Sequence, residues 1–466
     1  MQILKATVLT GCLLVAGCAG PFDRSWDDPV YGDIRDRYQQ ADELNARLRS
    51  DGDDLDESRP ALDGLAQLSV DDAIRVAIAN APSLRRAGYQ VDVAAGRVTQ
   101  TGLYPNPAFV FDAEGLGSDA GSGGETVYRI EQEIVLGGKL SKSRRVAESD
   151  RLAAQAGFVA EEFAVASRVT RAYFAALTAR ERLDNRQQLI ELSDRLLDAA
   201  TAQVEAGAAT EPDQLRAEVV REQAQIELES ARLDYDAARQ RLASAMGLDK
   251  PITLPLSSES RNLPELPDQD ALLTAALEAN GRIAVARLAI ERAQRAHSLA
   301  KAQSIPNIVA SIGPRYSDPD DETTLDVGLG VEIPLFDRNQ GNIRAALADR
   351  LSSAAALREV QLELIAEVSN AYAAYQSARA AVTRYDEQLL PKAERTLDLT
   401  RQAYQRGKAD YLRLLDAQQV VIESRIAYVD ALQRLHEAAA LLRELAQTEA
   451  PWRDSTTDRP NGGTDQ

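Results

Sequence analysis

The chain repeats itself at an almost constant spacing, and this duplication limits the folds open to it. Residues match at a spacing of 199, then 200, and the Pro105-Asn106 pair recurs 201 residues later as Pro306-Asn307. The other matches include Glu133 with Glu332, Ile134 with Ile333, Leu136 with Leu335, Arg145 with Arg344, Asp150 with Asp349, Leu152 with Leu351, Val169 with Val368, Tyr173 with Tyr372, Gly207 with Gly407 and Leu215 with Leu415. A period this long is no solenoid repeat. We therefore predict two copies of one unit, near 68–255 and 266–449.

The sequence pattern predicts the same order of helices and strands in each repeat. A helix of about 34 residues begins at Ser69, where Asp72 completes a capping box. Two strands follow, then a helix over about 141–206, a tight turn and a last helix over about 211–246. At 1.5 Å per residue the long helix measures about 100 Å, and the two shorter helices end to end match it. This predicts a rod of paired helices, with a kink at Pro391 in the second repeat.

The turn between the long helix and the last helix is short, charged and marked by glycine in both repeats. Gly207 suits the left-handed position that ends a helix. Thr210 is placed to cap the next helix, with Asp213 as its capping-box partner. Gly407 and Asp410 take the corresponding places in the second repeat. Each stretch, at 207–213 and 407–413, therefore predicts the tip of an αα-hairpin.

The first residues predict a cleaved leader and a lipid anchor. One Lys precedes an apolar run from Ala6 to Ala16, which is too short to span a bilayer. The run ends in Val15-Ala16-Gly17-Cys18, which resembles the bacterial lipobox; an ordinary signal peptide is the alternative. We expect residues 1–17 to be removed and Cys18 to carry a lipid, which leaves no disulfide. Ala19 stands after the cysteine instead of Asp, and the resemblance to bacterial lipoproteins then implies the outer membrane.

The two ends of the mature chain read differently from the repeats. Residues 19–67 hold 13 acidic residues against 6 Arg, so we expect 18–67 to be a lipidated, acidic strap or linker. The tail at 450–466 is expected to be disordered.

Four segments alternate between apolar and polar residues, as half-buried strands do. They lie near 107–115, 125–136, 307–316 and 323–335. In the last, one face carries Leu325, Val327, Leu329, Val331 and Ile333, and the other carries Asp326, Gly328, Gly330 and Glu332. Alternation alone favours a soluble sheet. The expected outer-membrane location and the number of strands favour a membrane β-barrel instead. Four strands cannot close a barrel around a pore, but the strands of several chains together can.

The chain resembles the TolC-type outer-membrane efflux family over Gln67 to about Glu449. The motifs are Leu68-Ser69-Val70-Asp71-Asp72-Ala73-Ile74, Tyr104-Pro105-Asn106-Pro107, and Gly407 with Leu415-Asp416-Ala417. The runs Glu131-Gln132-Glu133-Ile134 and Leu136-Gly137-Gly138-Lys139 are similar to the heavy-metal (CzcC-like) branch, although Leu140 stands where that branch often has Arg. The resemblance implies a mainly α fold with a small β part. A duplicated helical tunnel lies in the periplasm, and four strands per chain join a 12-stranded barrel in a homotrimer.

The resemblance also implies roles for the tips. They close the tunnel and meet a periplasmic membrane-fusion adaptor bound to an inner-membrane pump of the RND type. The expected adaptor contacts are Gly207, Thr210, Glu211, Gly407, Lys408 and Asp410. The expected gate residues are Asp213, Arg413 and Asp416, with an Asp213–Arg413 pair between neighbouring tips and Asp416 favouring cations. Alternatively, these charges only cap helices and stay solvated.

Other chemistry finds little support. The net charge of −19 disfavours nucleic acid. His297 and His436 lie far apart in helical sequence, where a surface role is expected, and no catalytic constellation or resident metal site is predicted. The glycine-rich 115–126 lacks a phosphate-loop ending and the acidic 317–322 lacks a calcium-loop pattern, so both are expected to be loops between strands. We expect no cofactor beyond the N-terminal lipid.

The sequence thus predicts a passive exit duct and not an enzyme. Its cargo is expected to be heavy-metal cations, with drugs or a secreted protein as alternatives. A different class of function, a periplasmic helical adaptor or spacer without a channel, also remains open.

Overall fold

The computed structural model describes residues 65–114, 124–207, 210–257, 263–317, 322–406, 408–409 and 411–447, together with Ala46 and Leu62. The leader with Cys18, most of the 18–67 strap and the 450–466 tail lie outside the described residues. So do Gly407 and Asp410 of the second tip and most of the loops at 115–126 and 317–322.

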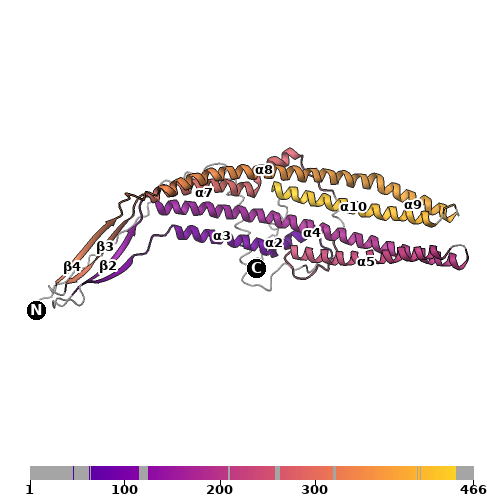
Figure 1. The fold of residues 1–466 in the computed structure, drawn as a ribbon, viewed down its shortest axis with the longest axis horizontal. Helices are drawn as coiled ribbons and strands as arrows, with labels where there is room; N and C mark the ends of the chain where they lie inside the picture. The colour runs from indigo at the N-terminus through magenta and orange to yellow at the C-terminus, as the bar shows by residue number, and fades with distance from the viewer. Residues whose placement is uncertain are drawn as a thin grey trace, which may run out of the picture.

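The described chain is a long rod with the sheet at one end and two helical hairpins at the other (Figure 1). Repeat 1 consists of α2 (Val70–Asn80), α3 (Pro82–Thr101), β1 (Ala108–Glu114), β2 (Glu125–Ile134), α4 (Lys139–Glu205) and α5 (Glu211–Ala245). Repeat 2 consists of α6 (Gln269–Ala279), α7 (Gly281–Gln303), β3 (Ile308–Ser317), β4 (Glu322–Val331), α8 (Gln340–Arg384), a π-helical turn η3 (Tyr385–Leu389), α9 (Leu390–Gln405) and α10 (Tyr411–Ala446). The predicted duplication and element order are both present.

The first helix of each repeat is broken, which the prediction of one helix of about 34 residues missed. Ala81 lies between α2 and α3 with extended backbone angles (φ −61°, ψ 117°). The cause is Pro82, whose ring disfavours a helical conformation in the preceding residue. Asn280 makes the same break in repeat 2, and its side chain accepts a hydrogen bond from the Arg282 amide to cap α7. The predicted capping box of Ser69 and Asp72 is confirmed at the start of α2.

The long helices have the predicted length. α4 runs unbroken for 67 residues, and its counterpart in repeat 2 is interrupted by the five residues of η3, which ends two residues before Pro391. Proline has no amide to donate and its ring crowds the carbonyl four residues earlier. Proline and π-turns both accompany helix kinks, and the kink at Pro391 itself stays a prediction.

The four strands form one antiparallel sheet in the order β1-β2-β3-β4. β2 of repeat 1 pairs with β3 of repeat 2, with Ile130 opposite Ile312. The strand predicted over 323–335 ends at Val331, so the predicted strand residue Ile333 lies beyond it. β4 ends where its partner begins, because Val331 lies opposite Ile308, the first residue of β3.

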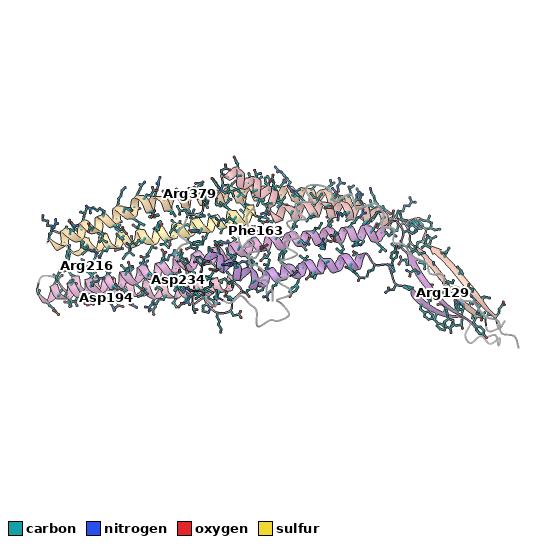
Figure 2. The ribbon with its side chains drawn as sticks, turned by 180° about the vertical axis from the view of Figure 1, so that it is seen from behind. Arg129, Phe163, Asp194, Arg216, Asp234 and Arg379 are labelled. Carbon is teal, nitrogen blue, oxygen red and sulfur yellow. The ribbon has the colours of Figure 1, made fainter. Side chains whose placement is uncertain are left out.

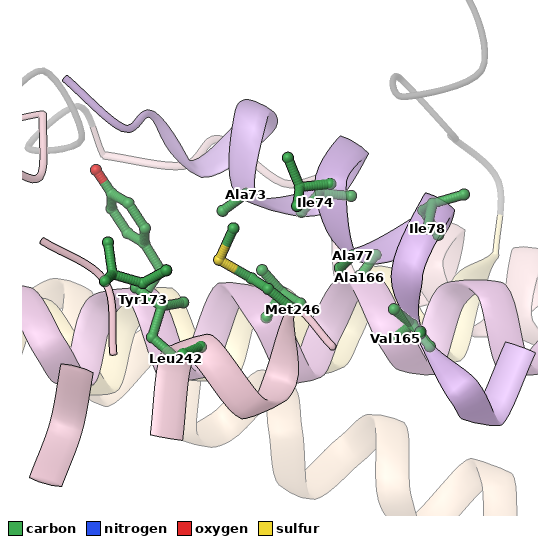
Figure 3. Close-up of a cluster of buried hydrophobic side chains, with 14 of the residues drawn as sticks. Ala73, Ile74, Ala77, Ile78, Val165, Ala166, Tyr173, Leu242 and Met246 are labelled. Atoms are coloured by element: carbon green, nitrogen blue, oxygen red, sulfur yellow. The ribbon is translucent and has the colours of Figure 1, made fainter. Parts of the chain in front are cut away.

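Each repeat has its own core near the middle of the rod. In repeat 1, α2 and the end of α5 pack on α4, with Met246 between them (Figure 3). The buried Tyr173 hydroxyl donates to the Leu68 carbonyl oxygen (2.9 Å). In repeat 2 the buried tyrosine is Tyr375, whose hydroxyl donates to the Pro264 carbonyl oxygen (2.7 Å). The sequence offset had matched Tyr173 to Tyr372, one helical turn earlier.

The two repeats meet along α4, which packs against both α7 and α10. Near the middle of this contact, the ring of Phe174 on α4 stacks on His436 of α10 (centroids 3.6 Å apart, planes 7° apart). His436 is therefore buried, and the predicted surface role is wrong for this residue. His297 is half-buried on α7.

Candidate functional site: the sheet faces and the hairpin tips

One face of the sheet is apolar and uncovered within the chain. On β4, Leu325, Val327, Leu329 and Val331 are 58–79% exposed. The register places apolar residues of the other strands on the same face: Phe109, Phe111, Tyr128, Ile130, Ile312 and Pro314. An exposed apolar patch of this continuity marks contact with a membrane or a protein. Ile333 is also exposed, but lies beyond the strand.

The opposite face of the sheet carries two ion-pair networks that sequence reasoning did not find. Arg129, labelled in Figure 2, pairs with Asp112 (2.6 Å) and Glu131 (2.7 Å). On the same face, a second arginine makes a matching network. Arg315 pairs with Glu125 and Asp326, both at 2.6 Å.

Both networks join residues on different strands. Diagonal neighbours on adjacent strands lie within reach of a long side chain. Three of the four carboxylates lie on a different strand from their arginine, so only the register could have revealed those pairs. With one apolar and one charged face, the sheet has the pattern of a barrel wall between lipid and water.

The first hairpin tip has the predicted local structure. Gly207 adopts a left-handed backbone (φ 69°) and no other group lies near the position of a Cβ, so the backbone alone requires glycine. Thr210 caps α5, and its hydroxyl and amide donate to the Asp213 carboxylate (2.7 and 3.1 Å). These hydrogen bonds, with Arg216 nearby, lower the pKa of Asp213. Glu211 is exposed in the first turn of α5, where its negative charge interacts favourably with the helix dipole.

The second tip is described in part. The Lys408 amide donates to the Ala403 carbonyl oxygen (2.8 Å), which closes the end of α9. Arg413 and Asp416 are exposed on the first turns of α10. Within the chain, Asp213 is held by its own turn, so the Asp213–Arg413 pair between neighbouring tips stays a prediction.

Among the described helices, none combines the length and apolar character needed to cross a bilayer. The described residues also contain no group of three or more His, Cys, Asp and Glu side chains arranged to hold a metal ion.

Comparison with known proteins adds independent information. A family model described as outer membrane efflux protein matches residues 73–248 and 272–446. The chain is 26% identical over 378 residues to the cobalt-zinc-cadmium resistance protein CzcC of Cupriavidus metallidurans, covering 80% of this chain and 89% of the relative. It is 28% identical over 298 residues to the nickel and cobalt resistance protein CnrC of the same organism, covering 62% and 69%. The fold matches the outer membrane protein VceC from Vibrio cholerae with a TM-score of 0.66 at 19% identity, covering 81% of this chain and 95% of that one.

Proposed function

The chain belongs to the outer membrane efflux protein family, and on that premise we propose that it is the exit duct of a tripartite system that exports heavy-metal cations. Its place is the outer membrane, with the helical tunnel in the periplasm. The observation that carries the proposal is the sheet, whose two faces suit lipid on one side and water on the other. A periplasmic spacer has no use for such a wall, so the duct is favoured over the adaptor alternative.

Three chains of four strands each would close the barrel, since four strands alone enclose no pore. The six hairpin tips would then meet around one axis at the periplasmic end. This arrangement suits contact with a membrane-fusion adaptor, itself bound to an RND pump, and the proposed contacts are Gly207, Thr210, Glu211, Gly407, Lys408 and Asp410. It also explains why one chain carries two tips of similar sequence.

The cargo proposal rests on the relatives, which are named for resistance to cobalt, zinc, cadmium and nickel. The charged face of the sheet supports it, because two arginines there are matched by four carboxylates. An acidic wall favours the passage of cations. The selection of metal then falls to the pump and adaptor.

Cys18 is proposed to carry the N-terminal lipid and to tether the duct to the outer membrane. Its support is the lipobox sequence alone. Intact mass of the membrane-extracted protein should show a lipidated chain that begins at Cys18; an unmodified chain that begins elsewhere would refute the anchor.

Metal accumulation tests the cargo. Cells that lack this chain but retain its pump and adaptor should hold more cobalt, zinc or cadmium after exposure, measured by elemental analysis. Restoring the chain should reverse the effect. If metal content stays unchanged while drug accumulation or protein secretion responds, the heavy-metal assignment is wrong and the duct serves another cargo.

A further inference from the structure

The join between the two repeats contains an asparagine clasp. Asn307, at the start of β3, donates from Nδ2 to the Glu133 carboxylate (2.5 Å). Its Oδ1 accepts from the Leu136 amide (3.2 Å) and from Lys139 Nζ (2.6 Å). One side chain from repeat 2 thus binds the end of β2 and the start of α4 in repeat 1.

The corresponding residues occur at the two outer edges of the chain, where the Leu335 amide donates to the Ile333 carbonyl oxygen (2.9 Å) and Arg338 lies 3.5 Å from the Leu335 carbonyl oxygen. Asn106 matches Asn307 at an offset of 201 residues; it lies two residues before β1, and Asn307 lies one residue before β3. Glu332 and Leu335 follow Glu133 and Leu136 by 199 residues, and Arg338 stands at the place of Lys139. Asn106 and Glu332 are exposed, and no side-chain hydrogen bond holds either within the described part of the chain.

We propose that a second copy of the chain completes this join. The inference rests on the proposed trimeric duct and specifies its subunit contact. Asn106 of one copy is clasped by Glu332 and Arg338 of its neighbour, as Asn307 is clasped by Glu133 and Lys139 within each chain. β1 of one copy then pairs antiparallel with β4 of the next.

The internal join also sets the register of this contact. Within the chain, Ile130 lies opposite Ile312 and Gln132 opposite Ala310. Moved to the outer edges by the repeat offsets, the same pairing places Leu329 opposite Phe111 and Val331 opposite Phe109 of the neighbour. All four belong to the apolar face. A slip of one residue would turn one strand's apolar side chains to the charged face, so the agreement of the faces is an independent check.

The helices next to the sheet show the same relation between a buried internal contact and an exposed outer edge. At the internal join, Leu152 of α4 and Leu288 of α7 lie in one buried cluster, at 6% and 1% exposure. The residues 199 positions away are Leu351 on α8 and Tyr89 on α3, at 62% and 55% exposure. Two large apolar side chains are thus exposed at the positions that correspond to the buried leucines of the internal join. Contact between α8 of one copy and α3 of the next covers both.

Cysteine pairs test the register directly in outer-membrane vesicles. Val110 and Gly330 are placed opposite each other on the charged face, and the mature chain has no cysteine besides Cys18. A chain with Val110→Cys and Gly330→Cys should form a covalent trimer on mild oxidation, reversed by reductant, because every contact of a closed ring is linked. The matched control, Val110→Cys with Val331→Cys, slips the pair by one residue onto opposite faces and should link poorly.

Two results would overturn the register: equal linking by the slipped pair, or no linking by either pair in trimers that remain intact. In both cases, the bilayer conductance of the same samples shows whether the protein still forms a channel, which is the test of the proposed function. If the parent protein forms neither trimers nor channels, the contact and the proposed function fail together.

The clasp has its own test. Asn106→Ala should lower the temperature at which trimers dissociate in detergent while the helical circular dichroism of the separated chains stays that of the parent. Asn307→Ala, which breaks the internal clasp, should instead reduce the stability of the chain itself. Trimers of Asn106→Ala that dissociate at the parent temperature would refute the clasp.

Discussion

Leu329 and Gly330 are neighbours in β4 whose positions face opposite sides of the sheet. Leu329 is 79% exposed on the apolar face. Gly330 lies on the charged face, where an added Cβ would meet only the Val309 carbonyl oxygen at 3.9 Å. The two positions therefore allow the same charge to be added to either face with little other change.

We expect Leu329→Arg to impair assembly far more than Gly330→Arg. Arginine on the lipid face near the bilayer midplane costs about 2–4 kcal/mol, whereas a charge facing water costs little. The fraction of trimer in outer-membrane extracts measures the difference. Equal loss of trimer in both variants would contradict the assigned faces.

At the scale of elements, the local signals in the sequence were readable and the distant contacts were not. The capping boxes at Ser69 and Thr210 and the left-handed Gly207 each depend on residues a few positions apart, and all three were predicted. β4 ends early because its partner β3 begins at Ile308, and the alternation within β4 contains no sign of that. The partners of Arg315 and the burial of His436 depend on register and on packing between repeats, which no local pattern contains.

The stacked pair of Phe174 and His436 gives a test of the join between α4 and α10. Phe174 is buried, and replacing a buried Phe by Ala costs about 3–5 kcal/mol. We expect Phe174→Ala to lower the midpoint of urea unfolding, followed by helical circular dichroism. Leu399→Ala, at a half-exposed position on α9, serves as the control and should stay within about 0.5 kcal/mol of the parent. Similar midpoints for both variants would show that the stack contributes little.

For the whole molecule, the duplication relates the one-chain structure to a closed tunnel. The spacings of 199 to 201 residues that relate the two repeats in the sequence also relate the contact between β2 and β3 within the chain to the proposed contact between β4 and β1 of neighbouring chains. The family and the rod shape could be predicted because the duplication and the helix lengths are visible along the whole sequence. The gate could not, because it forms between chains.

The gate would form where hairpin tips of neighbouring chains meet. If Arg413 pairs with Asp213 of a neighbouring tip, each exposed pair contributes about 0–1 kcal/mol, but symmetric copies add in the closed state. Arg413→Ala should then raise single-channel conductance, and Asp416→Ala should reduce the preference for cations. Currents equal to the parent's at low and moderate salt would place the gate elsewhere.

If copies of this chain enclose a water-filled path across the outer membrane, the purified parent protein should conduct ions when it is reconstituted in planar bilayers. We predict discrete, stable current steps that prefer cations. Folded protein that inserts or binds to the bilayer without conducting would contradict the duct and favour a helical adaptor.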